Sequence, residues 1–247
     1  MEIIDSFCGI GPWQRRDRLL PYRAGEILGL MDHFGIGAAL VHSNFSAGGG
    51  SPQRGNLMLR EACAKHPRLI PAFTLLPYPY PEAPTLEDEG AAMRDAGSKA
   101  VWLCPGSATA YPWAYAEILR MCVARRLPVF LHRDAEGLDR VNALCSEFPD
   151  LRLILAGVGY IEDWALYPLL RRHPNLHVCL GHYYIPSWGP MRFLQQFPAD
   201  RLLFGSGLPH FSPGGLVAHV MYADIPEEAR EKILSGNLQR LLGEVRP

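Results

Sequence analysis

The stretch SEFPDLRLILAGVG, residues 146–159, carries the pattern from which the fold can be deduced. A helical pattern ends at Glu147-Phe148-Pro149, because proline has no N–H to donate and its ring clashes with the preceding turn. A continuously apolar run, Leu151 to Ala156, follows directly. Such a run, without strict alternation, is typical of a parallel strand that is buried on both faces. The stretch therefore predicts a helix, a tight junction and a buried strand.

The same junction recurs along the chain, at Lys65-His66-Pro67, Arg172-His173-Pro174 and Gln196-Phe197-Pro198. Apolar runs predict eight strands, at residues 3–7, 37–41, 69–75, 99–103, 128–131, 151–156, 176–180 and 201–204. Amphipathic patterns predict helices between and after them, at residues 25–33, 56–65, 86–95, 114–126, 136–148, 163–172, 191–197 and 229–242. Eightfold alternation of strand and helix predicts an α/β fold, a (β/α)8 TIM barrel, as a single domain over residues 1–247.

Composition and charge exclude several classes of function. Glycine (24) and proline (22) make up nearly a fifth of the 247 residues, which is below the disorder range of roughly 25 to 30 per cent. The net charge is −1 and basic residues form no long run, so nucleic-acid binding is not expected. No apolar stretch approaches the roughly 18 residues of a membrane span, and the acidic start does not resemble a secretory signal. We expect a cytoplasmic protein with no membrane partner.

Histidines gather where the active site of such a barrel would lie. Loops that follow the strands build the active site in TIM barrels, and here these loops are predicted to be long, at residues 8–24, 42–54, 76–85, 104–113 and 182–190. Four of the nine histidines lie at or just after strand ends, namely His42, His132, His182 and His210. Imidazole at that rim can ligate a metal, transfer protons or bind an anionic substrate. The other reading is that each is a hydrogen-bonded structural residue.

Other reactive residues share this rim, and each has a structural alternative. Asp134 could orient an imidazole or act as a base, or it could cap a helix. Cys104, like Cys8, could be a thiolate nucleophile or a buried thiol. Tyr183 and Trp188 could wall an organic substrate or pack their loop. The predicted catalytic residues are His132, Asp134 and His182, and the predicted substrate-binding residues are His42, Cys104, Arg133, Tyr183, Trp188 and His210.

Three phrases resemble the amidohydrolase superfamily, and specifically its amidohydrolase-related branch with aminocarboxymuconate-semialdehyde decarboxylase. They are Ile3-Ile4-Asp5 in the first strand, Pro128 to His132 in the fifth, and Asp200 to His210 around the eighth. The resemblance runs over nearly the full length. It implies a (β/α)8 barrel with a divalent metal at its mouth, and hydrolysis or non-oxidative decarboxylation as the chemistry.

The metal positions depart from the family pattern. Where the resemblance implies Asp-x-His-x-His in the first strand, this chain has Phe7 and Gly9 in place of the histidines. Gly157 stands where a histidine is expected after the sixth strand, and Gly207 where an aspartate is expected after the eighth. Only His132 remains of the five positions. Phenylalanine and glycine side chains have no lone pair, whereas catalytic zinc normally needs three protein ligands.

These departures leave two hypotheses. In the first, the barrel has lost the family's metal site, needs no cofactor and binds a small organic molecule. In the second, an active hydrolase or lyase has a rebuilt site in which His132 works with His42, His182 or His210, either metal-free or around a relocated zinc ion. A pure scaffold has no positive support in the sequence. The oligomeric state stays open, a homodimer included.

Overall fold

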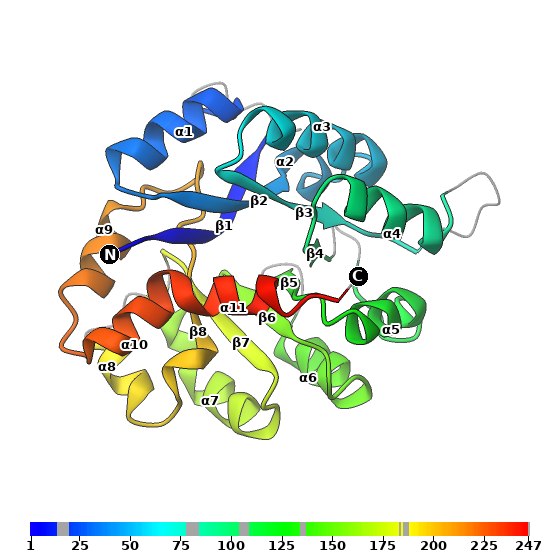
Figure 1. The fold of residues 1–247 in the computed structure, drawn as a ribbon. Coiled ribbons are helices and arrows are strands. Elements are labelled where there is room, and N and C mark those ends of the chain that lie inside the picture. Colours follow the sequence, from blue (N-terminus) through cyan, green and yellow to red (C-terminus); the bar gives the residue numbers. More distant parts are fainter. Residues whose placement is uncertain are drawn as a thin grey trace.

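Eight strands lie at the centre of the molecule with helices around them (Figure 1). The computed structural model describes residues 1–13, 20–77, 84–103, 109–133, 137–182, 184 and 188–246. The strands are β1 (Ile4–Ile10), β2 (Ala38–Ser43), β3 (Leu69–Thr74), β4 (Ala100–Trp102), β5 (Val129–His132), β6 (Leu153–Ala156), β7 (Leu176–Leu180) and β8 (Leu202–Phe204). Each pairs in parallel with the next, in the order of the sequence. The predicted (β/α)8 barrel is confirmed.

The helices follow the strands as the alternation predicts. Those in the first half are α1 (Ala24–His33), α2 (Asn44–Ala47), α3 (Pro52–Lys65), α4 (Leu86–Asp95) and α5 (Ala116–Ala124). Those in the second half are α6 (Leu138–Glu147), α7 (Asp163–Arg172), α8 (Gly189–Leu194), α9 (Gly214–Met221), α10 (Glu227–Glu231) and α11 (Asn237–Gly243), with a π-helical turn at Lys232–Gly236 between the last two. None of the helices in the described ranges has the length and apolar character that a bilayer crossing needs.

The segment after β2 differs from the long loop that the sequence predicts for residues 42–54. Ser43 caps a short helix, α2, because its Oγ accepts a hydrogen bond from the Ser46 N–H at 3.3 Å. Ser51 caps α3 in the same way, with Pro52 at the first position, where the missing N–H is not needed. Helix therefore occupies residues 44–47 and 52–54 of the segment for which the sequence predicts a loop.

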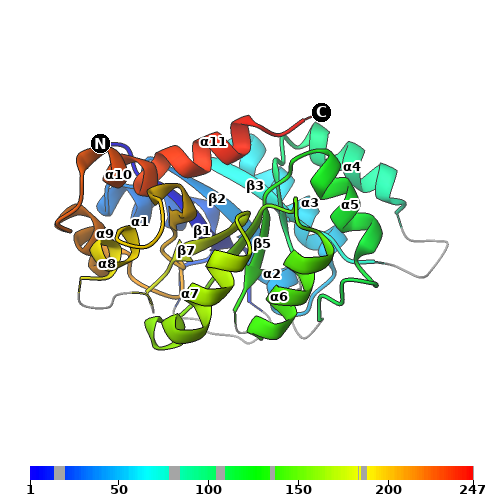
Figure 2. The ribbon, with the colours of Figure 1, turned by 90° about the horizontal axis from the view of Figure 1, so that it is seen from below.

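Two apolar cores hold the barrel together. The outer core lies between the strands and the surrounding helices. The inner core fills the barrel, and it includes Leu238, Leu241 and Leu242 of α11 together with strand residues such as Ile4 and Phe130. Figure 2 shows α11 lying across one end of the barrel. The last helix therefore closes the end at which the strands begin, and leaves the opposite end for a functional site.

The barrel closes between β1 and β8 through few backbone contacts. Cys8 and Leu208 form a single parallel bridge, in which the Gly9 N–H donates to the Leu208 carbonyl at 2.7 Å. The Gly207 N–H donates to the Phe7 carbonyl at 2.8 Å. Gly207 and Leu208 follow the carboxyl end of β8, so the seam is formed on the side of the barrel mouth.

A buried carboxylate strengthens this seam. Asp5 Oδ1 accepts hydrogen bonds from the Phe7 N–H at 2.9 Å and the Ser206 N–H at 2.8 Å, and the Ser206 hydroxyl donates to Asp5 Oδ2. Burial raises the pKa of Asp5 to about 6, although these donors act to lower it. Asp5 therefore links β1 to the segment after β8.

Candidate functional site at the barrel mouth

An aromatic stack occupies the interior of the barrel below its mouth. The Phe7 ring lies 5.5 Å from His42 and 5.4 Å from Trp102, centroid to centroid, and both pairs are nearly parallel. His42 and Trp102 stack at 4.1 Å. Phe7 is on β1, whereas Trp102 is on β4, which does not pair with β1. The Phe7 side chain must therefore reach across the barrel interior, where it is only 8 % exposed.

His132 is the polar neighbour of this stack. Its ring centroid lies 5.4 Å from that of Phe7, with the two planes tilted by 51°. His132 is half-buried at the end of β5, where it pairs with Ala156 of β6. The structure thus brings His42 and His132, two of the predicted site residues, to one aromatic cluster.

The electrostatics of His42 keep it neutral. Burial, together with the nearby imidazoles of His132 and His210, lowers the pKa of His42 to about 3. A ring with this pKa carries no proton to donate as an imidazolium at pH 7. His42 can therefore pack, accept or donate one hydrogen bond, or ligate, but it does not serve as a general acid at neutral pH.

Three glycines around the stack lie directly against a neighbouring side chain. A Cβ at Gly9 would overlap the Asn44 amide, one at Gly157 would lie 2.5 Å from His132 Nε2, and one at Gly207 would lie 2.8 Å from Phe211 Cδ2. Gly157 and Gly207 also have φ of +74° and +75°, which side-chain-bearing residues rarely adopt. The space that a longer side chain would need at these positions is already filled.

The other two histidines predicted for the site, His182 and His210, lie on the outer side of this cluster. His182 stacks on Phe211, the same ring that packs against Gly207. His210 is exposed and meets Trp13 edge-to-face at 5.0 Å. His42 and His132 thus belong to the inner part of the mouth, and His182 and His210 to its rim.

A hollow of about 230 Å³ opens between the segments after β1, β2 and β8. Trp13, Asn44, Pro209 and His210 are among its lining residues. Asn44 is 1 % exposed, and its Oδ1 receives no hydrogen bond from the described part of the chain. A buried amide oxygen without a donor is unfavourable by about 1 to 3 kcal/mol, so a ligand N–H or O–H at this atom would be stabilised.

Of the other predicted site residues, the structure describes Arg133 and Trp188. Arg133 forms a double ion pair with Glu162, in which Nε donates to Oε2 at 2.9 Å and Nη2 donates to Oε1. Trp188 is 62 % exposed and precedes α8 with a left-handed φ of +64°. Cys104, Asp134 and Tyr183 lie outside the described residues. Arg133 is therefore anchored to the segment after β6, and an anionic ligand would have to compete with Glu162.

Sequence reasoning missed Asn44, Trp102, Phe211 and Trp13. Trp102 is the last residue of β4 and Asn44 follows β2 directly, so their positions at strand ends were a usable signal. Phe211 and Trp13 lie in loops, and nothing in the sequence indicates that they meet His182 and His210.

No group of three or more His, Cys, Asp or Glu side chains that could hold a metal ion lies within the described ranges. Among the described rings that pack against Phe7, only His42 and His132 carry nitrogen ligands of the kind that zinc or manganese binds. His42 stacks on Trp102, and the Phe7 ring lies beside this pair. The residues that surround Phe7 do not fit a divalent metal with three protein ligands.

Comparisons with known proteins agree with this fold. A family model described as Amidohydrolase matches residues 25–243. None of the curated proteins matches the sequence. Among solved structures, an uncharacterised TIM-barrel protein from Bordetella bronchiseptica is 20% identical, with a TM-score of 0.74 and 99% of each chain covered.

Two similar structures are decarboxylases with bound manganese. A dihydroxybenzoic acid decarboxylase from a Polaromonas species, which also holds the inhibitor 2-nitroresorcinol, is 17% identical with a TM-score of 0.76, covering 98% of this chain and 97% of that one. A 5-carboxyvanillate decarboxylase from Novosphingobium aromaticivorans is 14% identical with a TM-score of 0.77, at the same coverage. At these identities the likeness establishes the shared fold.

Proposed function

Because the chain belongs to the amidohydrolase family, which its match over residues 25–243 establishes, we propose that it is a barrel of this family with a degenerate metal site. It binds a small organic molecule at the C-terminal face of the barrel. The observation that carries the proposal is the aromatic stack of Phe7, His42 and Trp102 below the mouth.

The chemistry of the side chains supports the loss of the metal site. Phe7, Gly9, Gly157 and Gly207 stand at the positions where the family resemblance implies ligands, and none of them offers a side-chain lone pair. Asn44, His132 and Phe211 fill the space beside the three glycines. A single lost ligand could be replaced by water, but four losses leave His132 alone, below the three protein ligands that catalytic zinc normally uses.

The hollow beside Asn44 supports ligand binding. Trp13 and His210 supply ring surfaces at its rim, and Asn44, whose buried oxygen has no donor in the described residues, supplies a polar group in its wall. Small-molecule sites generally combine such apolar walls with a few well-placed polar groups. The ligand that fits is a small organic molecule with an N–H or O–H group.

Metal content tests the first part of the proposal. Protein purified without chelators should contain far less than one equivalent of zinc, iron or manganese by elemental analysis, and added zinc or manganese should give no saturable heat at the barrel mouth. A stoichiometric metal that is lost in the variant His132→Ala would overturn the proposal. His66→Ala, in the junction after α3, is the control for nonspecific imidazole binding.

Ligand binding tests the second part. The phenolic inhibitor 2-nitroresorcinol, bound in the Polaromonas structure, is a usable probe because it carries O–H donors. Its affinity should fall about tenfold or more in Asn44→Leu, which removes the buried acceptor. Asn175→Leu, in the loop between α7 and β7, should leave the affinity unchanged. Equal affinity in wild type and Asn44→Leu would contradict the role of Asn44.

An active hydrolase or lyase with a rebuilt site is the second candidate. The proximity of three imidazoles favours it, since His132 and His210 both depress the pKa of His42. In this case His132 works with His42, His182 or His210, metal-free or around a relocated metal. Turnover of para-nitrophenyl acetate or 2,6-dihydroxybenzoate should then fall about 100- to 10,000-fold in His132→Ala, and not in His66→Ala. Absence of turnover in wild type favours the binding protein.

A further inference from the structure

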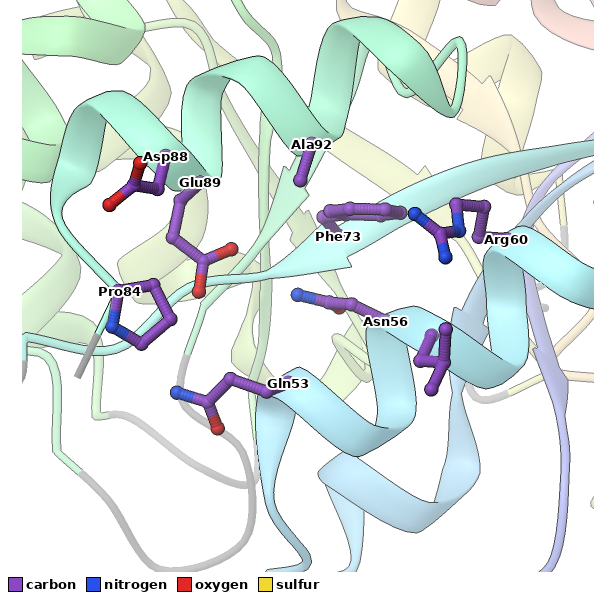
Figure 3. Close-up of a pocket in the computed structure, with 9 residues that line it drawn as sticks. Gln53, Asn56, Arg60, Phe73, Pro84, Asp88, Glu89 and Ala92 are labelled. Carbon is purple, nitrogen blue, oxygen red and sulfur yellow. The ribbon is translucent and has the colours of Figure 1, made fainter. Parts of the chain in front are cut away.

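A second pocket lies on the outside of the barrel, between α3 and α4, away from the mouth. Its volume is about 300 Å³, at the lower end of the range for small-ligand sites. Apolar side chains form much of its wall, and they include Leu57, Phe73, Pro84 and Ala92. Figure 3 shows charged side chains on two opposite sides of this pocket, Glu89 from α4 and Arg60 from α3.

Glu89 is a half-buried carboxylate without a counter-ion. It makes no hydrogen bond or ion pair with any of the residues that the structure describes. Its neighbour Asp88 is different, because Oδ2 of Asp88 accepts from the N–H and the hydroxyl of Thr85 in a capping box. Burial raises the pKa of Glu89, and Asp88 adds to the rise. A cation in the pocket would compensate the buried charge of Glu89, whereas Asp88 is already used by the helix cap.

Arg60 supplies the opposite charge. It lines the same pocket from α3, and no ion pair or hydrogen bond joins it to the residues within the described ranges. In Figure 3 its guanidinium points toward the Phe73 side of the pocket, across from Glu89. A guanidinium in this position can bind a carboxylate with two parallel hydrogen bonds.

The wall between these two charges is held in place by the fold. Asn56 Nδ2 donates to the Thr74 carbonyl at 2.9 Å, and the Thr74 N–H donates to Asn56 Oδ1 at 2.8 Å. Both ends of the amide are thereby used to attach α3 to the end of β3. Asn56 and Phe73 are almost fully buried, at 4 % and 2 % exposure. The spacing between α3 and the strand below it is therefore preset, which lowers the ordering entropy of binding.

We propose that this pocket binds a small zwitterion, with its ammonium group at Glu89, its carboxylate at Arg60 and its apolar methylene chain over Phe73. Charges on opposite walls select a molecule whose two charged groups are separated by several bonds. Amines and carboxylates that carry one charge would use only one wall. The site is independent of the barrel mouth and of the function proposed for it.

The test is calorimetric titration of the intact protein with ε-aminocaproate, and with hexylamine and hexanoate as singly charged analogues. The zwitterion should bind at one site, and the affinity should fall about tenfold or more in Glu89→Gln and in Arg60→Gln, because each variant removes one charged contact. Glu87→Gln on α4 and Lys65→Gln on α3 are matched controls, since neither residue lines the pocket.

The titrations distinguish a zwitterion site from nonspecific binding. The site is supported if Glu89→Gln and Arg60→Gln lose affinity for ε-aminocaproate while Glu87→Gln and Lys65→Gln keep it. Hexylamine and hexanoate should also bind more weakly than ε-aminocaproate to the wild type. Absence of saturable binding by wild type, binding that neither variant weakens, or equal affinity for hexylamine or hexanoate overturns it. Urea unfolding of each variant shows that it is folded, so a loss of binding is not mistaken for a loss of structure.

Discussion

At the scale of single residues, a glycine at the mouth of the barrel leaves space for a neighbouring side chain. Gly157 has a left-handed φ of +74°, and the His132 ring lies where its Cβ would be. A side chain at this position requires both backbone strain and displacement of His132. The glycine thus leaves the space that the His132 imidazole occupies.

Gly157→Ala is expected to lower the free energy of unfolding by about 1 to 3 kcal/mol, because left-handed backbone is unfavourable for alanine and the methyl group contacts His132. Urea denaturation measures the effect. Gly29→Ala in α1, where nothing lies within 4 Å of the added methyl, should be neutral or stabilising by about 0.5 to 1 kcal/mol. Equal effects of the two substitutions would contradict the assignment.

At the scale of elements, a buried arginine joins a helix end to a strand at the closed side of the barrel. Arg201 is 9 % exposed. Its Nε donates to the Leu176 carbonyl at 2.6 Å, and its Nη2 donates to the carbonyls of Leu170 and His173 at 3.1 and 2.8 Å. The last carbonyls of a helix have no N–H partner within it, and the Arg201 guanidinium donates hydrogen bonds to carbonyls at the end of α7.

Arg201→Lys should therefore destabilise the protein by about 2 to 3 kcal/mol, since an ammonium group cannot reproduce the planar fork that serves three carbonyls. Thermal or urea unfolding checks this value. Arg172→Lys, on the exposed surface at the end of α7, is the matched control and should change stability by less than about 0.5 kcal/mol.

His177 in β7 makes the same region sensitive to acid. Burial, followed by the charge of Arg201, lowers the pKa of His177 to about 4 in the folded protein, against about 6.5 in the unfolded chain. The unfolded chain therefore binds more protons between these values, and stability falls as the pH is lowered from about 6.5 to about 4.

His177→Gln should reduce this acid sensitivity by up to about 1.4 kcal/mol per pH unit over that window, as measured by urea unfolding at a series of pH values. His33→Gln, an exposed histidine at the end of α1, is the control and should leave the slope unchanged. An unaltered slope in His177→Gln would show that other groups carry the acid sensitivity.

At the scale of the whole molecule, the barrel depends on a narrow seam between its first and last strands. Asp5 accepts the N–H and the hydroxyl of Ser206 across this seam, and the Phe7 N–H within β1. Asp5→Ala leaves the N–H groups of Phe7 and Ser206 unpaired, so it should lower the free energy of unfolding by about 2 to 5 kcal/mol. Denaturant unfolding gives the value directly.

Asp5→Asn distinguishes hydrogen bonding from charge. Its oxygen can accept both N–H groups and its amide can donate to Ser206 Oγ, so it should retain most of the stability at pH 7. The pKa of Asp5 is about 6 when folded and about 4 when unfolded, so the folded wild type binds more protons in between and its stability falls as the pH rises through this window. That fall should be absent in Asp5→Asn. A loss as large as in Asp5→Ala would show that charge is essential.

The sequence by itself determined the architecture. Helix-stopping prolines, buried apolar runs and amphipathic helices are local patterns set by backbone geometry and burial, and they predicted all eight strands to within a few residues. They also placed His42 and His132 at the ends of their strands, on the face where the aromatic cluster lies.

Only the tertiary structure decided what this face contains. Phe7 meets Trp102 across the barrel, Asn44 lies over Gly9, and Phe211 fills the space beside Gly207. None of these contacts follows from periodicity, because they join residues on different strands or in loops and depend on how side chains fill a shared interior. The physical reason is that a strand's local pattern fixes which face a residue occupies, whereas close packing of the whole barrel selects its neighbour.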